Sequence, residues 1–302
     1  MDIAVCIELD REERQRLIRG VGDCPVTFSQ AAEPCSAAIV FGNPAPDVVA
    51  ANSSLRWLQL ESVGFGEYAG LRWSRSGHSV QVTNLAGFFA DPVAETALAG
   101  ILSLGRGIDR LVALRERRDW VGDPVRGSLR LLCGSHVVLF GRGTINSRLA
   151  ELLKPFHCRI TTFGRDWTSD ALDRALSTAD VIVATVPHTP ETIGLFDADR
   201  LSRLKPGAVF CNLGRGSLVD EGALANALAH EHLGGAVIDV TRDEPLPGGH
   251  VFWTAPNLIL TQHSGGGSGD EIDRKIDHFL ENLARFRRGT PLVGLVDFRR
   301  GY

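Results

Sequence analysis

The feature that most limits the folds open to this chain is a series of apolar runs in its second half. Each run is long enough for a strand, and the runs lie at residues 136–140, 159–163, 180–185, 208–212, 235–239 and 257–261. They lack the alternating polar residues of a strand with one face in water, and helix-compatible segments separate them. Buried strands joined by helical crossovers form a parallel sheet that is covered on both faces. The pattern therefore predicts a doubly wound α/β domain.

Similar apolar runs begin the chain and predict a second α/β lobe. These runs lie at residues 3–9, 37–42, 57–60 and 80–84, and 302 residues are enough for two domains of ordinary size. A helical pattern from about Asp91 to Arg118 leads into the second lobe. A last helical pattern, from Asp270 to Arg288, could return the chain to the first lobe. We therefore predict two domains, the first of them discontinuous, with these bounds: 1–90 together with 270–302, and 91–269.

The composition argues against several kinds of partner. The formal net charge is −4, so the chain lacks the basic excess of an electrostatic nucleic-acid binder. Its most apolar helical stretch, residues 93–104, contains Glu95 and is shorter than the roughly 20 residues of a membrane span. The cysteines lack metal-ligand spacing, as in a reduced cytosolic protein, and the first residues lack the profile of a secretory signal. We expect a cytoplasmic protein with a small-molecule partner and with no metal, no membrane and no nucleic acid.

A glycine-rich turn follows the first strand of the second domain, in the sequence VVLFGRGTINSRLAELL. Because a strand precedes the turn and a helix follows it, Gly141 permits the tight turn and Gly143 lets the backbone approach a pyrophosphate. The first turn of the helix, with Thr144 and Ile145, supplies free N–H groups and the positive end of a dipole. The third glycine of such motifs, which serves helix packing, is replaced by Asn146. We expect a dinucleotide to bind, with altered packing at that position.

The residue after the next strand indicates which dinucleotide binds. An acid normally stands there and binds the ribose 2′-hydroxyl of NAD, but this chain has Gly164 followed by Arg165. The change removes a charge that repels a 2′-phosphate and adds a planar cation that can bind it. We therefore predict NADP as the cofactor. NAD is the less favoured alternative, in which Asp166 serves the ribose.

Three charged residues stand where late strands end, which is where open α/β sheets bind their ligands. These residues are Arg215, Glu244 and His263. Each also has a purely structural interpretation: a loop salt bridge for the arginine, a solvated turn acid for the glutamate and a hydrogen-bonded core residue for the histidine.

The blocks around these residues occur in order and resemble the signature of the D-isomer-specific 2-hydroxyacid dehydrogenase family. The blocks are CNLGRGSLVDEGAL, GGAVIDVTRDEPLP, APNLILTQHSGG and ENLARFRRGTPLVGLVD. The similarity extends over nearly the whole chain and is weakest before residue 55. It implies two Rossmann-like domains, namely a flavodoxin-like substrate domain and a dinucleotide-binding domain. It also implies that Arg215, Glu244 and His263 form the catalytic triad.

The resemblance assigns further residues to the site. The segment ESVGFGEYAG resembles the loop whose backbone N–H groups hold the substrate carboxylate, which implies Ser62, Val63 and Gly64. Asp239 matches an acid of the family beside the nicotinamide. The segment VPHTPET lies at a strand end close to the cofactor of the family, which implies Pro187 as a cofactor-binding residue. His188, in the same segment, is either a further cofactor contact or a loop residue.

Three positions depart from the family pattern. Asn146 replaces the third glycine and Gly164 replaces the usual ribose-binding aspartate, so both changes bear on the cofactor. Gln262 stands where the family has a proline before the catalytic histidine. That change can alter how rigidly His263 is presented, but it leaves the imidazole in place.

The residue types of the triad suit hydride transfer to a 2-oxo acid. Hydride arrival puts negative charge on the carbonyl oxygen, which calls for a proton donor that titrates near neutrality, as histidine does. His263 fits this role, and Glu244 on the far ring nitrogen would stabilise the imidazolium and orient the ring. Arg215 would bind the carboxylate and polarise the oxo group with its fixed set of donors.

We therefore predict an enzyme, an NADP-dependent oxidoreductase that reduces a 2-oxo acid to the D-2-hydroxy acid and resembles a glyoxylate/hydroxypyruvate reductase. Two alternatives stay open. One is a non-catalytic NAD(P)-sensing or corepressor-like protein, because the fold of the family also occurs in binding proteins. The other is a related dehydrogenase that acts on a non-hydroxyacid such as formate or phosphite.

Aromatic residues near the predicted site raise the questions of substrate size and assembly. Phe65, Phe88, Phe89 and Trp253 could line an apolar substrate pocket or could belong to the core. Trp120 matches a family position that reaches across a dimer, so we expect a homodimer.

Overall fold

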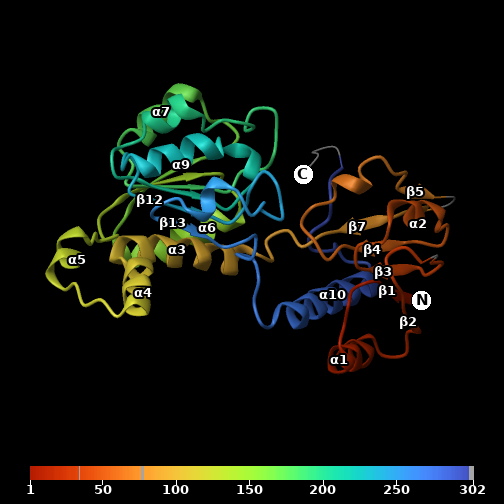
Figure 1. Cartoon of the computed structure of the whole chain (residues 1–302). Coiled ribbons are helices and arrows are strands. Elements are labelled where there is room, and N and C mark those ends of the chain that lie inside the picture. Colours follow the sequence, from red (N-terminus) through yellow and green to blue (C-terminus); the bar gives the residue numbers. More distant parts are fainter. Residues whose placement is uncertain (34, 76–77, 299–302) are drawn as a thin grey trace. The chain divides into compact units, whose positions relative to one another are not determined.

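The computed structural model describes residues 1–33, 35–75 and 78–298. The chain forms two compact units, each with its own parallel sheet (Figure 1): Met1–Phe88 with Ser268–Tyr302, and Phe89–Gly267. The sequence predicted that the first segment ends at residue 90 and that the last segment begins at residue 270. The observed boundaries, 88 and 268, each lie two residues earlier. The last four residues of the segment 270–302 lie outside the described residues.

The first unit is built on a five-stranded parallel sheet in the order β2-β1-β3-β4-β7. Its strands are β1 (Ile3–Val5), β2 (Val26–Phe28), β3 (Ile39–Phe41), β4 (Trp57–Gln59) and β7 (Gln81–Thr83), and the short pair β5 (Ser74–Arg75) and β6 (His78–Ser79) is antiparallel. The strand order is the flavodoxin-like one, which confirms the fold class of this unit. The sequence analysis missed β2, because this edge strand is half-buried and its central Thr27 is exposed.

Helices cover both faces of the five-stranded sheet, which explains why its strands are apolar on both sides. On one face α1 (Arg11–Val21) and α10 (Glu271–Arg288) pack against Ile3, Val5 and Phe41. The other face, with Val40 and Leu58, packs against α2 (Pro46–Ala51) and the 3-10 turn η1 (Gly66–Tyr68). The last long helix therefore packs within the first unit.

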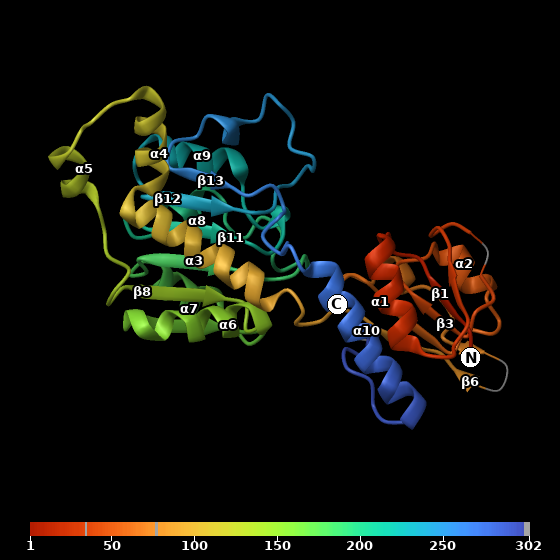
Figure 2. The same cartoon turned by 90° about the horizontal axis from the view of Figure 1, so that it is seen from below.

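The second unit contains a six-stranded parallel sheet in the order β13-β12-β11-β10-β8-β9 (Figure 2). Its strands are β8 (His136–Phe140), β9 (Arg159–Phe163), β10 (Val181–Ala184), β11 (Val209–Asn212), β12 (Gly235–Ile238) and β13 (Leu258–Leu260). Each strand falls within one of the predicted apolar runs, so the doubly wound fold is confirmed. The direction of strand addition reverses between β8 and β10. Ligands of such sheets bind at this point, outside the carboxyl ends of the strands.

The helices of the second unit form two layers around this sheet. One layer consists of α3 (Ala90–Arg106) and α6 (Thr144–Leu153), and the other of α7 (Ser169–Leu176), α8 (Ala198–Ser202) and α9 (Glu221–Ala229). Short 3-10 turns lie at η2 (Lys154–Phe156), η3 (Gly216–Leu218) and η4 (Val251–Trp253). Both layers bury apolar side chains, which accounts for the continuous apolar runs of the strands.

The prediction of a single helix from 91 to 118 was wrong. Gly107 has a left-handed backbone, with φ 62°, and it separates α3 from α4 (Ile108–Arg117). Because the chain changes direction there (Figure 1), Ile108 is 50% exposed and does not continue the buried face of α3. The helix α5 (Asp123–Ser128) follows, and neither α4 nor α5 buries a residue.

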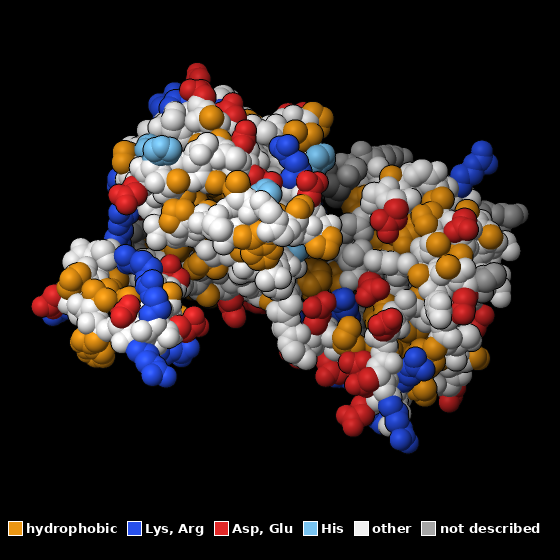
Figure 3. Space-filling model, in the orientation of Figure 1, with side chains coloured by type: hydrophobic (Ala, Val, Ile, Leu, Met, Phe, Trp, Pro, Cys, Tyr) orange, Lys and Arg blue, Asp and Glu red, His pale blue; other side chains and the backbone are white. Residues whose placement is uncertain are grey.

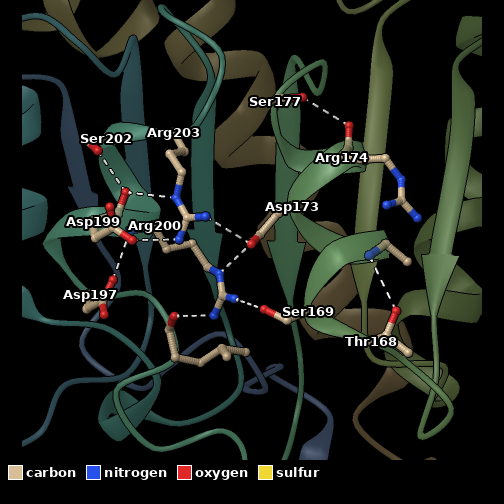
Figure 4. A network of polar contacts seen from close by, with 12 residues as sticks. Thr168, Ser169, Asp173, Arg174, Ser177, Asp197, Asp199, Arg200, Ser202 and Arg203 are labelled. Atoms are coloured by element: carbon tan, nitrogen blue, oxygen red, sulfur yellow. Dashed lines mark hydrogen bonds and ion pairs between the residues drawn. The ribbon is translucent and has the colours of Figure 1, made fainter.

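A buried arginine joins α7 to α8. Arg200 is 9% exposed, and its Nε donates a hydrogen bond of 2.8 Å to Asp173 Oδ1 (Figure 4). Its two Nη atoms donate to Ser169 Oγ at 2.6 Å and to the carbonyl oxygen of Leu195 at 2.8 Å. The guanidinium therefore anchors the end of the long loop that follows β10.

In the described part of the chain, no helix combines the length and the apolar character needed to cross a bilayer. The His, Cys, Asp and Glu side chains of the same residues form no group suited to a metal ion. All six cysteines are free thiols, and Cys211 is buried while Cys133 is exposed.

Candidate active site

The candidate residues of the second unit follow successive strands at one edge of its sheet. Gly141 follows β8, Gly164 follows β9, and Asp239 follows β12. Arg215 and His263 each stand three residues after the end of a strand, β11 and β13 respectively. Because parallel strands all end at the same edge, these residues lie on the side of the sheet where doubly wound folds bind ligands.

The imidazole of His263 lies against the carboxylate of Glu244. His263 Nδ1 and Glu244 Oε2 are 2.6 Å apart, which is a short hydrogen bond of the kind that charge strengthens. The other carboxylate oxygen, Oε1, accepts a hydrogen bond of 2.9 Å from the backbone N–H of Thr241. Within the described residues the other ring nitrogen, Nε2, has no partner, and the His263 side chain is 56% exposed. The pair therefore orients the ring and leaves Nε2 accessible.

The surroundings of Glu244 favour its ionised form. Partial burial acts to raise the pKa of this carboxyl, but the ring of His263, the N–H of Thr241 and the charge of Arg215 outweigh it. The pKa of Glu244 is consequently lowered from its ordinary value. At neutral pH the group is a carboxylate, so it can act as the counter-charge of an imidazolium.

The loop that carries Arg215 is held by a buried asparagine. Asn212, at the end of β11, donates through Nδ2 to the carbonyl oxygen of Arg215 at 2.9 Å and accepts the N–H of Gly214 at 3.2 Å. The guanidinium itself donates to the carbonyl oxygen of Gly214 at 2.7 Å. The side chain is exposed, and no carboxylate of the described residues lies within ion-pair distance of it. Its remaining donors are thus available to an anion.

Backbone contact connects the loop after β11 with its neighbours. A Cβ atom on Gly216 would overlap the carbonyl group of Thr241, in the loop after β12. A Cβ atom on Gly214 would lie 2.7 Å from the carbonyl oxygen of Val186, in the loop after β10. Both positions therefore require glycine, and the loop of Arg215 packs directly against the loop of Glu244.

A second pair of histidine and glutamate braces the loop that carries Glu244. His250 Nε2 and Glu221 Oε2 are 3.2 Å apart, and their side chains are only 22% and 13% exposed. Glu221 Oε1 also accepts the backbone N–H of Arg242 at 2.8 Å. The sequence analysis did not single out Glu221, because an acid in the first turn of a helix has an ordinary interpretation there.

Asp239 fixes the loop that presents His263. This aspartate is buried, and its Oδ1 accepts hydrogen bonds from Thr261 Oγ1 at 2.6 Å and from the N–H of Gly265 at 2.9 Å. The backbone carbonyl oxygen of Asp239 accepts the N–H of His263 at 2.6 Å. Every one of these contacts lies within the turn from 261 to 265, so Asp239 acts on the placement of the imidazole.

The turn before His263 has an unusual backbone. Gln262 and His263 have φ angles of 56° and 55°, in the left-handed region that non-glycine residues seldom adopt. Proline has a φ near −65°, so the proline of the family pattern would not fit this conformation at position 262. The departure at Gln262 therefore goes together with a left-handed turn that the contacts of Asp239 hold in place.

The glycine turn after β8 has the features of an oxyanion site. Gly141 has φ 114°, and a Cβ atom on it would lie 2.9 Å from Thr185 Oγ1, so glycine is required. Gly143 is the N-cap residue of α6 and provides no side-chain cap, while a Cβ atom on it would meet no protein atom within 4 Å. Thr144 and Ile145 are the first two residues of α6, so their backbone N–H groups have no acceptor within the helix and are available to a pyrophosphate.

Asn146 replaces the packing of a third glycine with hydrogen bonds. Its side chain is 1% exposed, and Nδ2 donates to the carbonyl oxygens of Gly141 at 2.8 Å and of Phe140 at 3.3 Å. Its Oδ1 is buried and has no partner among the described residues. The amide therefore ties the first turn of α6 to the end of β8 and supports the glycine turn.

Two arginines and an aspartate surround the end of β9. A Cβ atom on Gly164 would lie 3.2 Å from Arg142 Cζ and 3.1 Å from Asp166 Oδ1. Arg142 Nη1 and Asp166 Oδ1 are 3.7 Å apart, and both side chains are mainly exposed. Arg165, the cation expected from the sequence, is exposed as well. The sequence analysis missed Arg142, because it occupies an unspecified position between two glycines.

Pro187 and His188 follow β10 at the same edge of the sheet. The carbonyl oxygen of Pro187 accepts a hydrogen bond of 2.7 Å from Thr192 Oγ1. His188 Nδ1 and Ser217 Oγ are 2.6 Å apart, which links the loop after β10 to the loop of Arg215. His188 therefore has a structural contact of its own at this edge.

Ser62, Val63 and Gly64 belong to the first unit and form the loop after β4. The carbonyl oxygens of Ser62 and Val63 accept hydrogen bonds from the N–H of Leu85 at 3.0 Å and from Asn84 Nδ2 at 2.7 Å. Within the described residues, the backbone N–H groups of the three loop residues have no acceptor. These N–H groups are therefore available to an anion.

The aromatic candidates differ in their surroundings. Phe65 is 4% exposed and packs edge-on against Phe298 at 5.5 Å, so it belongs to the core of the first unit. Phe88 lies beneath the guanidinium of Arg274, 4.5 Å from it. Trp253 is 47% exposed and donates through Nε1 to the carbonyl oxygen of Pro247 at 2.8 Å.

The doubly wound sheet with its glycine turn is typical of the dinucleotide-binding class of proteins, and comparison with known sequences gives the family. The profile described as "D-isomer specific 2-hydroxyacid dehydrogenase, NAD binding domain" matches residues 98–265. Hydroxyphenylpyruvate reductase of Plectranthus scutellarioides is 30% identical over 239 residues, which are 77% of this chain and 75% of that protein. The chain therefore belongs to the D-isomer-specific 2-hydroxyacid dehydrogenase family, whose members bind NAD(P).

Solved structures show the same fold. A D-isomer specific 2-hydroxyacid dehydrogenase family protein from Aeromonas salmonicida has a TM-score of 0.80 and 29% identity, over 98% of this chain and 99% of that one. An NADPH-dependent glyoxylate/hydroxypyruvate reductase from Sinorhizobium meliloti, in complex with NADP and sulfate, has a TM-score of 0.81 and 23% identity, over 100% and 99%. The second likeness concerns the fold alone.

Proposed function

We propose that this protein is an NADP-dependent oxidoreductase that reduces a 2-oxo acid to the D-2-hydroxy acid, in the manner of a glyoxylate/hydroxypyruvate reductase. The observation that carries the proposal is the 2.6 Å hydrogen bond between His263 Nδ1 and Glu244 Oε2. It holds an accessible imidazole at the ligand-binding edge of a dinucleotide-binding sheet, with a carboxylate on its far nitrogen. This is the arrangement of a general acid with its orienting partner.

His263 is the proton donor in this proposal. Its Nε2 gives a proton to the carbonyl oxygen of the substrate as negative charge develops there. Glu244 stays ionised because its pKa is lowered. Its carboxylate balances the charge of the imidazolium and fixes the ring through Nδ1. The hydride comes from C4 of the nicotinamide when the cofactor is bound. Asp239 supports the step indirectly, because it holds the turn of His263.

The carboxylate of the substrate needs fixed positive partners. Arg215 has exposed donors that can bind this carboxylate and polarise the oxo group. In the first unit, the loop of Ser62, Val63 and Gly64 offers backbone N–H groups to the same kind of anion. We therefore assign the substrate-binding loop of Ser62, Val63 and Gly64 to the first unit, and Arg215 together with dinucleotide binding to the second.

The cofactor-binding residues are proposed from the same edge of the sheet. They are Gly141, Gly143, Thr144 and Ile145 for the pyrophosphate, Pro187 and Asp239 for the nicotinamide side, and Gly164 with Arg165 for the adenosine ribose. The uncapped start of α6 and the open space over Gly143 support the pyrophosphate assignment. The missing acid at Gly164 supports NADP over NAD, because position 164 itself has no carboxylate to bind the ribose 2′-hydroxyl of NAD or to repel a 2′-phosphate.

The identity of the 2-oxo acid remains for a substrate panel to decide. One relative bears the name of an enzyme for hydroxyphenylpyruvate, which is large and aromatic, and a protein of the same fold is named for glyoxylate and hydroxypyruvate, which are small. Phe65 is buried in the core and is therefore not assigned to the pocket wall. We propose the small substrates first, since the assigned residues account for the carboxylate and oxo groups alone.

We infer that the protein is a homodimer in the cytoplasm. Apolar side chains of α4 and the following segment are exposed by 41 to 98%, namely Ile108, Leu111, Val112, Val121 and Trp120. Figure 3 shows apolar patches beside arginine side chains on the protruding part that α4 and α5 form. Exposed apolar groups of this kind mark contact surfaces. The free cysteines support a reducing compartment. A monomeric mass by light scattering at micromolar concentration would contradict the dimer.

The proposal is tested by NADPH oxidation with a panel of 2-oxo acids. We expect turnover in the unaltered protein, its loss in His263→Gln with NADPH binding retained, and its retention in the matched control His230→Gln, an exposed residue at the end of α9. Nucleotide binding without turnover of any 2-oxo acid would indicate a sensor instead. Oxidation of formate or phosphite would indicate the related dehydrogenase.

A further inference from the structure

A guanidinium lies where the side chain of a ribose-binding acid would begin. A Cβ atom on Gly164 would be 3.2 Å from Arg142 Cζ and 3.3 Å from Arg142 Nε. Any acid at position 164 would therefore be in contact with Arg142. This arginine comes from the glycine turn after β8, directly before Gly143, so it bridges the ends of two adjacent strands.

Asp166 is the partner of Arg142 across Gly164. The two side chains approach to 3.7 Å between Nη1 and Oδ1, and they are 59% and 78% exposed. A pair that is exposed and longer than a hydrogen bond is weak. A phosphate carries more charge than one carboxylate and offers three acceptor oxygens to a guanidinium. A 2′-phosphate at this place can therefore displace Asp166 from Arg142.

We propose that Arg142 is a specificity-determining residue that binds the 2′-phosphate of NADP, and that Asp166 is a competing carboxylate that pairs with its guanidinium beside Gly164 until the phosphate displaces it. The inference rests on the proposed NADP-dependent function and adds to it a second cation beside Arg165. It gives the two neighbours opposite effects. Arg142 strengthens the binding of a 2′-phosphate, and the like charge of Asp166 weakens it.

Two nucleotides isolate the effect of the 2′-phosphate. Isothermal titration measures the binding of 2′,5′-ADP and of 5′-AMP, which lacks the 2′-phosphate. The unaltered protein is expected to bind 2′,5′-ADP more tightly. Arg142→Gln should weaken 2′,5′-ADP roughly ten- to hundredfold, the range for one hydrogen-bonded contact to a charged group, and change 5′-AMP by about twofold or less. The control Arg126→Gln, in an exposed pair with Asp123 at 3.4 Å, should change neither.

The outcomes separate this inference from the function on which it rests. If Arg142→Gln keeps the full preference for 2′,5′-ADP, the role of Arg142 is overturned while the reductase and its NADP preference stand. If the unaltered protein shows no preference, the NADP assignment and this inference both fail, although turnover with NADH would preserve the reductase. Loss of turnover in His263→Gln bears on neither nucleotide measurement, since neither involves hydride transfer.

Asp166→Asn distinguishes the two possible roles of the aspartate. If Asp166 is a competing like charge, Asp166→Asn should bind 2′,5′-ADP severalfold more tightly, with a larger effect at low salt. If Asp166 instead accepts the ribose hydroxyls of NAD, Asp166→Asn should bind 5′-AMP more weakly and have a higher KM for NADH. The second result would overturn the competing role.

Discussion

Glu221 Oε2 and His250 Nε2 are 3.2 Å apart, and His250 ends the loop that carries Glu244. The other oxygen of Glu221 accepts the N–H of Arg242 at 2.8 Å. One carboxylate on α9 therefore restrains both ends of the loop that orients the imidazole of His263. Precise placement of a general acid affects the rate more than it affects the binding of the cofactor.

Glu221→Ala should therefore lower kcat about tenfold and leave the KM for NADPH nearly unchanged, because a shift of the acid by less than 1 Å is costly. Glu221→Gln, which keeps an acceptor for the N–H of Arg242, should recover part of the loss. Steady-state kinetics of both variants is the measurement, and Glu231→Ala, at an exposed turn, is the control. Equal kcat values for the alanine variant and the unaltered protein would remove the bracing role.

Glu244→Gln should shift the pH dependence of reduction. The pKa of Glu244 is lowered in the fold, so its carboxylate contributes stability at all pH values above its ordinary pKa, and this contribution is lost only as the pH falls through the lowered pKa. The counter-charge is therefore present over the whole neutral range. In the unaltered enzyme kcat should therefore fall on the acid side only as Glu244 becomes protonated, whereas Glu244→Gln lacks the counter-charge at every pH and should have a lower kcat without this acid dependence. A variant that keeps both the kcat and the acid limb of the unaltered enzyme would contradict this role.

Asn146→Asp should destabilise the second unit more than Asn146→Ala does. The buried amide Nδ2 lies within hydrogen-bond distance of three backbone carbonyl oxygens, and an isosteric carboxylate would face these oxygens without a proton to donate. Alanine should cost about 1–2 kcal/mol for the lost hydrogen bonds, and aspartate more than that. Urea unfolding gives the difference. Two variants of equal stability would show that these hydrogen bonds contribute little.

Arg200→Met should destabilise the protein by about 3 kcal/mol, because it leaves the largely buried carboxylate of Asp173 with only the more exposed Arg203 as its cation. The double variant Arg200→Met with Asp173→Leu should be more stable than the single one, since it removes the unpaired charge. Thermal unfolding of the single and double variants, with Arg174→Met as an exposed control on α7, tests this expectation. A double variant no more stable than the single one would contradict it.

The strands of the second unit could be predicted because each is buried on both faces, which leaves an uninterrupted apolar run in the sequence. The break at Gly107 could not be predicted in the same way. A glycine inside a helix lowers its stability only by about 1 kcal/mol, so the apolar periodicity of Val93, Ala97 and Ile101 outweighed it. Edge strand β2 could not be predicted, because it has only three residues and its central residue is exposed. Three residues are too few to show the alternation of apolar and polar side chains that identifies a half-exposed strand.

Some residues of the candidate site could also be identified from the sequence, and others could not. Arg215, Glu244 and His263 were identifiable because their sequence blocks follow strand ends, but the residues that hold them were not. Glu221 acts on a loop more than twenty residues away in the chain, and Arg142 acts across two adjacent strand ends. Such contacts depend on how loops come together at the edge of the sheet, and no local pattern of residues encodes them.

The lack of a side chain at Gly216 has a consequence for the evolution of this enzyme. The peptide of Thr241 fills the space that a methyl group would need, so even alanine would push apart the turns that bear Arg215 and Glu244. A small, uncharged substitution at Gly216 would alter the distance between the two charged side chains without changing either of them. A search for activity-impairing mutations that considers only reactive groups would overlook this position.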